Sequence, residues 1–533
     1  MITKSLILIF VAHSGLCVAQ VKRSPNIIIF LADDLGYGDL AAYGNTEQES
    51  GPLEKMAQEG VRFTQWTSPS FACTPSRSAL LTGRYAVRSG VYGNSSRNFT
   101  PTSTGGLPAS EITIAEVLKP FGYTTGMVGK WHLGINQATS TDGVHLPHNQ
   151  GFDYVGSNFP FTHSKTCDGE HNVDNGSPGG GKRQGGRRAR RRGRSRRQAG
   201  RQSGSKLCFR YEGSQIVEQP YSTSNLTQKF VEDAISFVKT NKDNKFFLYV
   251  ALPQPHPVWF CNSDFCGKSK RGEYGDVLNE MAWAVGKVLD QLKTLGIDKD
   301  TLAIFASDHG ARQPTCDSTW SNGPFRGGKG TTWEGGIRVP AIAWWPGTLP
   351  ANTVSNTFIN HLDIWPTAVK LAGGFNYLTV LKSTGYHIDG QSIPDLMSSI
   401  SRSTPQRNQM FYYCSDRLMA VRYGNYKVLY RTMGEFATTS GCDNSEKYSC
   451  YGDDIVEHNP PIVVDLVKSP GETVAENNYH ATTKFIILMA SRLVHQHEST
   501  KNNIQPSQLD LATNDRLSPC CNPPSCSCSG SSQ

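Results

Sequence analysis

The chain has 533 residues, 37% of them apolar, which suits a globular protein with one large domain and a smaller one. Its formal net charge of +8 is concentrated in one stretch, because residues 182–201 contain one Lys, ten Arg and no acid. Subtracting these eleven charges leaves −3 for the rest of the chain, which excludes a broadly basic, nucleic-acid-binding surface. We therefore expect no nucleic-acid partner.

Residues 1–19 are typical of a secretory signal peptide. Lys4 precedes an apolar run over 6–11, and small residues precede a predicted cut after Ala19. No later run approaches the ~20 apolar residues of a membrane span. We expect a protein of the secretory pathway, extracellular or lysosomal, without a transmembrane segment. The N-glycosylation sequons that fit this expectation are at Asn94, Asn98, Asn175 and Asn225.

Four short apolar runs are each followed by polar residues that can bind a metal or take part in catalysis. Continuous apolar runs are typical of parallel strands buried on both faces, and helical segments at 112–118 and 226–239 suit crossover connections. Ligands of such sheets bind at the carboxyl ends of the strands. We expect an α/β domain over 20–390. The runs and the residues after them are 26–31 with Asp33 and Asp34, 123–128 with Lys130 and His132, 245–251 with His256, and 301–306 with Asp308 and His309.

The last part of the chain has a different pattern. Residues 417–423 and 426–430, joined by Gly424-Asn425, predict a β-hairpin with a two-residue turn. A further strand is predicted over 462–466 and a helix over 484–496. We expect 391–533 to form a smaller domain, an antiparallel sheet covered by one helix. Its tail holds Cys520, Cys521, Cys526 and Cys528.

An Arg-rich, Gly-rich insertion covers about 176–205, between Cys167 and Cys208. Its low hydrophobicity and like charges predict disorder. Three interpretations stay open: a solvated insertion, a site at 182–201 for sulfated glycans or other polyanions, and cleavage by a furin-type convertase after Arg197. Cleavage would leave two chains, joined if Cys167 pairs with Cys208.

Cys73 opens the segment CTPSRSALLTGR, with Pro75 and Arg77 close behind. The chain has 14 Cys, and 13 remain outside the predicted signal peptide, so one cannot pair within the chain. Asp33, Asp34, Asp308 and His309 form a plausible cation site, in which hard oxygen donors favour Ca²⁺ or Mg²⁺.

These motifs together resemble the type I sulfatases, closest to the animal arylsulfatases such as arylsulfatase A and N-acetylgalactosamine-6-sulfatase. The resemblance covers nearly all of the chain from Pro25 onward and implies the alkaline-phosphatase-like fold: a large, mostly parallel sheet between helices, with a smaller C-terminal sheet. The motifs that carry it are 26–36, 73–83, 129–134, 148–153, 255–257 and 327–336.

The resemblance implies a sulfuric ester hydrolase acting on aryl sulfates, sulfated sugars or lipids. Cys73 is then oxidised during secretion, by a formylglycine-generating enzyme, to the aldehyde 3-oxoalanine (formylglycine). Many relatives carry Asn where this chain has His309, and Thr162 matches a hydroxyl residue near the substrate. The implied ligands of one divalent cation, Ca²⁺ in preference to Mg²⁺, are Asp33, Asp34, residue 73, Asp308 and His309, and the implied sulfate pocket holds Arg77, Lys130, His132, His256 and Lys329.

The chemistry of each role follows from the residue types. One hydroxyl of the hydrated aldehyde attacks sulfur, and cations stabilise the charge that develops. His256 or Lys329 gives a proton to the departing oxygen, and His132 takes the proton of the second hydroxyl, which expels sulfate. Lys130 and His132 are expected two apart on one strand face, whereas His163, His361 and His387 are interpreted as structural.

Two other functions compete with this one. A phosphoester hydrolase of the same superfamily is the first, but such enzymes use Ser or Thr where this chain has Cys73. The second is a secreted protein of this fold that mainly binds matrix polyanions through the Arg-rich insertion. The complete catalytic set argues against loss of activity.

Overall fold

The computed structural model describes residues 24–94, 97–159, 209–312, 319–397, 406–434, 436, 455–501 and 504–520. Several features predicted from the sequence lie outside these residues. They are the signal peptide, the Arg-rich insertion with Arg197, Asn175, Thr162, His163, the pair Cys167 and Cys208, and Cys521, Cys526 and Cys528.

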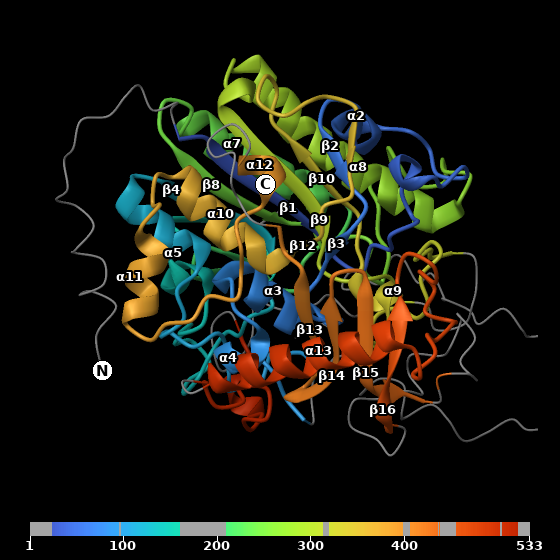
Figure 1. The fold of residues 1–533 in the computed structure, drawn as a ribbon. Coiled ribbons are helices and arrows are strands. Elements are labelled where there is room, and N and C mark those ends of the chain that lie inside the picture. Colours follow the sequence, from blue (N-terminus) through green and yellow to red (C-terminus); the bar gives the residue numbers. More distant parts are fainter. Residues whose placement is uncertain are drawn as a thin grey trace, which may run out of the picture.

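A ten-stranded sheet forms the centre of the larger part (Figure 1). Its five middle strands, from β9 to β5, are parallel, and the strands at both edges include antiparallel neighbours. The order across the sheet is β11 (Thr353–Ser355), β2 (Val61–Phe63), β10 (Ala341–Trp344), β9 (Thr301–Ser307), β1 (Asn26–Ala32), β8 (Phe246–Ala251), β4 (Thr124–Lys130), β5 (Tyr154–Phe159), β6 (Arg210–Glu212) and β7 (Gln215–Glu218).

Helices cover both faces of this sheet, because alternate residues of each apolar strand point to opposite sides. Ile27, Ile29 and Leu31 of β1 pack in one core, with α3 (Cys73–Thr82), α5 (Ile114–Leu118) and α10 (Ile364–Leu371). Ile28 and Phe30 pack in the other, with α2 (Pro52–Gln58), α7 (Leu226–Thr240) and α8 (Gly272–Thr294). The predicted sandwich of helices around a mostly parallel sheet is confirmed.

The remaining elements are short. A two-stranded sheet joins β3 (Trp66–Thr67) to β12 (Ile359–Asn360). The other helices are α4 (Ala86–Ser89), α9 (Glu334–Ile337), α11 (Tyr377–Ser383) and α12 (Pro394–Met397). Single 3₁₀ turns lie at Ala41–Tyr43, Lys119–Phe121, Pro147–Gln150, Asp298–Asp300, His361–Asp363 and Asp515–Leu517. Within the described part of the chain, no helix is both long enough and apolar enough to cross a membrane.

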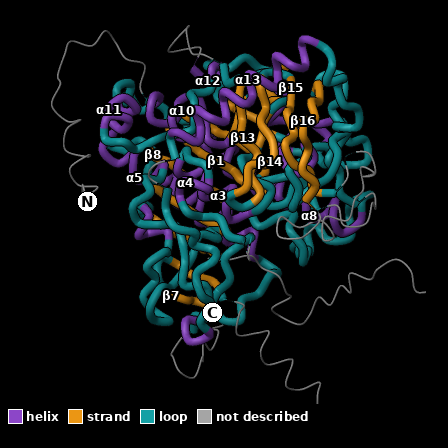
Figure 2. The backbone as a smooth tube through the Cα atoms, turned by 60° about the horizontal axis from the view of Figure 1, so that its bottom comes forward, coloured by secondary structure: helices purple, strands orange, loops and turns teal. Residues whose placement is uncertain are grey.

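A separate four-stranded antiparallel sheet follows, in the order β13 (Gln409–Cys414), β14 (Arg417–Tyr423), β15 (Tyr426–Met433) and β16 (Ile455–Asp465). Its strands lie side by side with α13 (Ala481–Ser499) along them (Figure 2). The predicted hairpin around Gly424-Asn425 is confirmed, and the helix is longer than predicted. Cys261 pairs with Cys266, and Cys414 and Cys520 each take part in a disulfide bond.

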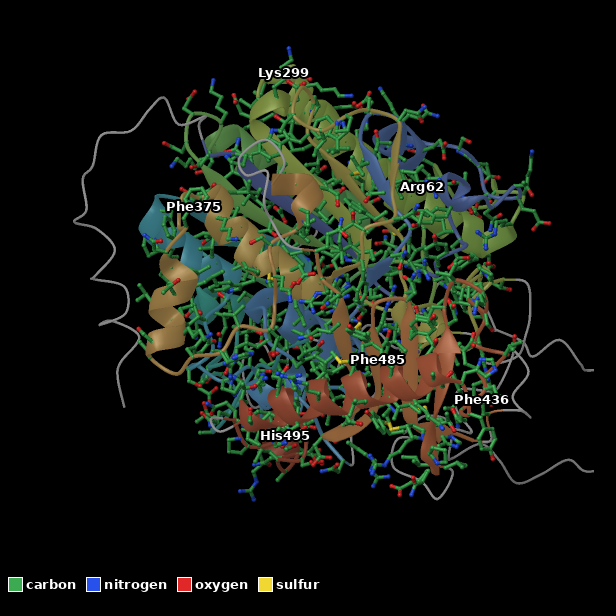
Figure 3. All side chains as sticks on the ribbon, in the orientation of Figure 1. Arg62, Lys299, Phe375, Phe436, Phe485 and His495 are labelled. Carbon is green, nitrogen blue, oxygen red and sulfur yellow. A yellow bond between two sulfur atoms is a disulfide. The ribbon has the colours of Figure 1, made fainter. Side chains whose placement is uncertain are left out.

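The two faces of this small sheet have different partners. On one face, Ile486 and Ala490 of α13 pack against the sheet, while Phe485 remains about half exposed (Figure 3). On the other face, the strands share a core with Phe71, Ala72 and Trp333. The small sheet therefore packs directly against two segments of the larger part, one just before Cys73 and one just after Lys329.

Candidate active site

Two neighbouring strands carry the acidic residues of the site. In the parallel pair of β1 and β9, Ala32 lies opposite Ser307, so Asp33 and Asp34 emerge beside Asp308 and His309. The backbone N–H of Asp34 donates to Asp308 Oδ1 at 3.2 Å. Asp34 has a φ of +66°, a strained conformation for a residue with a side chain. This turn brings carboxylates from two distant parts of the chain together.

Cys73 is the first residue of α3, a helix in which every residue is buried. The N–H groups of a first helical turn have no partners within the helix, and here Asn98 Oδ1 accepts from the N–H of Thr74 at 3.0 Å. Thr74 Oγ1 donates to the carbonyl of His132 at 3.0 Å. Cys73 is only 1% exposed and is the free cysteine of the described residues.

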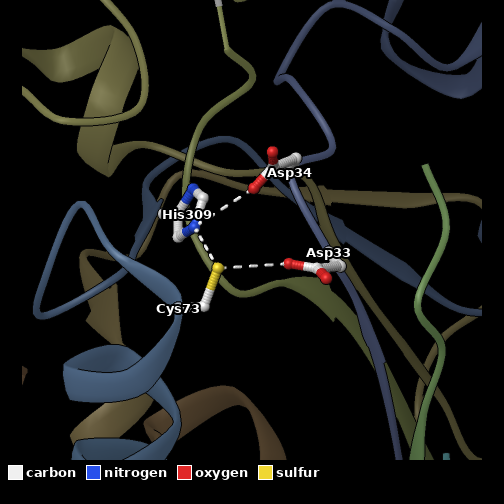
Figure 4. Close-up of side chains that lie close together, drawn as sticks. All are labelled: Asp33, Asp34, Cys73 and His309. Atoms are coloured by element: carbon white, nitrogen blue, oxygen red, sulfur yellow. Dashed lines mark hydrogen bonds and ion pairs between the residues drawn. The ribbon is translucent and has the colours of Figure 1, made fainter. Parts of the chain in front are cut away.

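Cys73 faces the strand ends in a compact cluster (Figure 4). Its Sγ lies 3.4 Å from Asp33 Oδ1 and 3.3 Å from His309 Nε2, and His309 Nε2 lies 3.3 Å from Asp34 Oδ1. One donor atom from each of these four residues lies within 4.8 Å of the others. Asp308 borders the cluster, with Oδ1 3.5 Å from His309 Nε2.

The tautomer of His309 is set by its second nitrogen. Nδ1 lies 2.9 Å from the carbonyl of Gly310, which makes Nδ1 the protonated nitrogen. Nε2 then turns a lone pair toward the two Asp carboxylates. An imidazole fixed in this way is a common metal ligand, so the donor set of carboxylates and imidazole fits a divalent cation.

Three cationic side chains surround the acids: Arg77 and Lys130 are fully buried, and Lys329 is 18% exposed. Lys130 Nζ contacts Asp33, Lys329 Nζ lies 2.6 and 2.8 Å from the oxygens of Asp34, and Arg77 Nη2 lies 2.9 Å from Asp308 Oδ2. Burial alone raises the pKa of Asp33, but Lys130, His256 and Arg77 hold it well below its usual value. The site therefore places the ionised Asp33 beside positively charged side chains, an arrangement suited to a bound anion.

Cys73 as a thiol is poorly suited to attack a substrate. Burial raises its pKa, and the negative charge of Asp33 raises it further. Because the thiolate is the nucleophilic form, an unmodified Cys73 stays protonated and weakly reactive at physiological pH. Residue 73 thus lies among charged groups suited to a nucleophile, but the pKa of its thiol is too high for the thiol to act as one.

His132 differs from its predicted place. β4 ends at Lys130, and His132 follows with a φ of +59°. The interpretation that Lys130 and His132 share one strand face is therefore wrong, because the chain turns sharply after the strand. His132 Nε2 lies 3.2 Å from the carbonyl of Phe99. Burial, Lys130 and Arg77 lower its pKa well below 6.5, so the ring is neutral.

His256 and Lys329 are the most exposed of the predicted site residues. The side chains of Lys329 and His256 are 18% and 15% exposed, whereas every other predicted site residue is almost fully buried. His256 Nε2 lies 3.8 Å from Asp34 Oδ2.

Sequence reasoning missed two residues of the site. Asn98, noted only as a sequon, holds the first turn of α3, and Tyr249 places its hydroxyl 3.4 Å from Arg77 Nη1. Tyr249 lies inside the apolar run of β8, which gave no signal of a polar role. His361 agrees with its structural interpretation, because Trp66 Nε1 donates to its Nδ1 and its Nε2 contacts the carbonyl of Ser307.

Comparison with known proteins assigns the chain to a family. A family described as Sulfatase matches residues 25–374, and one described as the C-terminal region of aryl-sulfatase matches 405–528. The chain belongs to the sulfatase family. It is 40% identical to an arylsulfatase of Hemicentrotus pulcherrimus, over 94% of this chain and 85% of that protein. Human arylsulfatase A is 34% identical, over 98% of this chain and 96% of that one, and rat steryl-sulfatase 34%, over 86% of each.

Solved structures support the same architecture. The PsFucS1 sulfatase from Pseudoalteromonas sp. matches with a TM-score of 0.74 at 24% identity, over 92% of each chain. A likeness at this identity carries the fold alone. Membership of the sulfatase family, with arylsulfatases and steryl-sulfatases as relatives, makes this chain a sulfuric ester hydrolase with a site suited to a metal ion and a Cys-derived formylglycine.

Proposed function

We propose that the active form carries formylglycine at position 73 and one Ca²⁺ ion, and that it cleaves sulfate esters by attack of residue 73 on sulfur. The observation that carries this proposal is the place of Cys73: the first turn of a buried helix, ringed by Asp33, His309 and Lys329. The nearby cations Arg77, Lys130 and Lys329 attract an anion. The thiol itself is too weakly acidic to act there.

Asp33, Asp34, Asp308 and His309 are the residues that would hold the ion together with residue 73. Carboxylate oxygens favour Ca²⁺ or Mg²⁺, and the bound ion supplies positive charge to the attacking and sulfonate oxygens. The hydrated aldehyde supplies one hydroxyl for attack and a second whose deprotonation releases sulfate.

The side chains around residue 73 have separate roles in charge stabilisation and proton transfer. Arg77 and Lys130 are buried, charged and fixed by ion pairs, so they stabilise negative charge without reorganising. Neutral His132 accepts the proton that releases sulfate. His256 or Lys329, the most exposed of these side chains, gives a proton to the departing oxygen.

Substrates in this proposal are aryl sulfates, sulfated sugars or sulfated lipids. The partially exposed side at His256 and Lys329 admits the alcohol portion, while the buried ring of charges receives the sulfate. We place catalysis in a domain of residues 20–390 and a supporting role in residues 391–533.

The proposal also includes passage through the secretory pathway, where a formylglycine-generating enzyme modifies Cys73. Support comes from the leader-like residues 1–19 and the sequons. For the insertion around 182–201 we propose exposure, with binding of sulfated glycans and furin-type cleavage after Arg197 as its two candidate roles. Reducing gels of secreted protein test the cleavage: two bands are expected, and a single intact band contradicts it.

The decisive test is the mass of the proteolytic peptide that contains residue 73, taken from secreted protein. Conversion of the thiol to the aldehyde is expected, together with hydrolysis of 4-nitrophenyl sulfate. A Cys73→Ala variant is the control and is expected to be inactive. An unmodified thiol in fully active protein contradicts the proposal.

A further inference from the structure

The segment that carries Lys329 is irregular up to Glu334, where the one-turn helix α9 begins. We call residues 326–336 the Lys329 loop. Within the larger part of the protein, Lys329 N–H donates to the carbonyl of Ala311 and Gly330 N–H to that of Phe71, at 3.0 and 3.1 Å. Because Lys329 itself lies outside any helix or strand, the position of its Nζ depends on these tertiary anchors.

One further anchor comes from the small C-terminal sheet. Lys427 of β15 is fully buried, and its Nζ points at the Lys329 loop. Nζ donates to the carbonyl of Thr332 at 2.8 Å and to Glu334 Oε1 at 3.3 Å, and it lies 2.8 Å from Glu472 Oε1. An ammonium has three protons to donate, and three oxygens surround this one.

Glu472, which follows β16, makes a second connection to the same loop. Its Oε2 accepts from the backbone N–H of Glu334 at 2.6 Å, and its carbonyl accepts from Arg326 Nη1 at 3.3 Å. The Glu472 side chain is buried, and its φ of +53° is a strained conformation. Two carboxylates and one ammonium are therefore buried together. Removing one of the three leaves a remaining charge buried without a partner, which destabilises the folded protein.

These polar contacts are directed at the loop itself. The small sheet already packs on the larger part through an apolar core that includes Phe358, Leu429 and Val464. Lys427 and Glu472 add hydrogen bonds to the main chain at Thr332 and Glu334, three and five residues after Lys329. At the other end of the connection, Lys329 Nζ lies 3.7 Å from Cys73 Sγ. The network thus runs from the small sheet to the reacting residue.

We propose that Lys427 and Glu472 are positioning residues, which hold the Lys329 loop so that Lys329 Nζ stays beside Asp34 and residue 73. Hydrolysis at the large sheet then depends on a buried ion group supplied by the small one. This inference rests on the proposed role of Lys329 in the sulfate pocket. A displacement of about 1 Å at such a group costs up to about a hundredfold in rate.

A double-mutant cycle tests the inference on the full-length protein. Lys427→Met keeps the length of the side chain and removes its charge; we expect kcat for 4-nitrophenyl sulfate to fall about tenfold to a hundredfold, with KM changed less. In the Lys329→Ala background, the same substitution is expected to lower kcat by less than about threefold, because its effect acts through Lys329. A merely structural role lowers kcat equally in both backgrounds.

Lys468→Met is the matched control. Lys468 also lies between two acids, Asp465 and Glu476, in the same part of the chain, but it is 67% exposed. We expect its kcat to stay within twofold of the wild type. Circular dichroism and thermal unfolding establish that each variant is folded. If Lys427→Met does not fold, Glu472→Gln replaces it in the cycle, because the amide keeps the size of the side chain and removes the charge that pairs with Lys427 Nζ.

Two results overturn the inference: an unchanged kcat in the folded Lys427 variant, or an equal loss with and without Lys329. Both presuppose an active wild type. A wild type that hydrolyses no sulfate ester contradicts the proposed function instead, so the two failures are distinguishable.

Discussion

Arg77 and Asp308 form a fully buried ion pair in which Nε and Nη2 of Arg77 lie 3.1 and 2.9 Å from one oxygen, Asp308 Oδ2. The other oxygen, Oδ1, accepts from the N–H of Asp34. Asp308 therefore links the helix that begins at Cys73 to the end of β1. Removing one member of a buried pair costs more than the pair contributes, because the other charge is left in a dry environment.

Arg77→Lys tests whether this geometry matters beyond charge. A lysine ammonium cannot reproduce the two contacts to Asp308 together with the contact to the carbonyl of Lys130. We expect kcat to fall at least tenfold, with stability reduced by about 3 kcal/mol in urea unfolding. Arg431→Lys is the control, because Arg431 pairs with the exposed Glu457; its kinetics are expected to match the wild type. Equal kinetics of the two variants contradict the prediction.

Leaving groups of different acidity separate the roles of His256 and Lys329. A proton donor matters most when the departing alcohol is a poor leaving group. We expect His256→Ala to slow an alkyl sulfate by about a hundredfold and 4-nitrophenyl sulfate much less. Lys329→Ala, which removes a charge beside Asp34, is expected to slow both substrates to a similar extent. The opposite pattern of kcat assigns the proton transfer to Lys329.

Removal of divalent cations is expected to lower both activity and thermal stability. Asp33 and Asp34 bring two carboxylates into one buried cluster, and a cation offsets their repulsion. After dialysis against a chelator, we expect most of the activity to be lost and the melting temperature to fall. Ca²⁺ is expected to restore both more fully than Mg²⁺. Full activity in protein shown by elemental analysis to be metal-free is the contrary result.

Because of the buried His361, we expect the protein to lose stability in acid. Burial lowers the pKa of His361 to about 4. Protonation of Nδ1 would also remove the acceptor of the N–H that Trp66 donates to it. Between about pH 6.5 and 4 the unfolded chain binds a proton that the folded chain does not. The contribution of neutral His361 to the free energy of unfolding is complete above pH 6.5 and is lost as the pH falls toward 4.

Urea unfolding of the wild type and of His361→Gln checks this sign. The stability difference between the two proteins is expected to shrink by about 2 kcal/mol between pH 7 and pH 5. If the stability difference between the two proteins stays constant over this pH range, His361 is not the source of the acid sensitivity. Ser392→Ala, at a buried position without a titrating group, is the control.

Much of the fold and site followed from local patterns in the sequence. Asp33 and Asp308 could be placed together because each follows an apolar run, and parallel strands end at one edge of a sheet. Cys73 was distinguished by its motif and by cysteine parity. The hairpin at Gly424 had a turn signal of its own.

Other features have no local signal. The positive φ of His132 is set by contacts such as the bond from Thr74, and the short strands of the sheet edges, β2 and β10 among them, pair only after distant segments meet. Asn98 looked like a surface sequon, yet it accepts a hydrogen bond at the start of α3. Lys427 lies 98 positions after Lys329 in the sequence, so only the packed structure shows that they belong together.

The burial of Cys73 also orders events in time. In the folded chain its sulfur lies behind His309, Asp33 and Lys329, and only 1% of the residue is accessible. An enzyme that oxidises this thiol needs the segment 73–84 in an extended, reachable form, and the assembled helix offers neither. Under the proposed function, we therefore expect the oxidation of Cys73 to be completed before β1, β9 and α3 come together, so that the speed of folding limits how much of the protein becomes active.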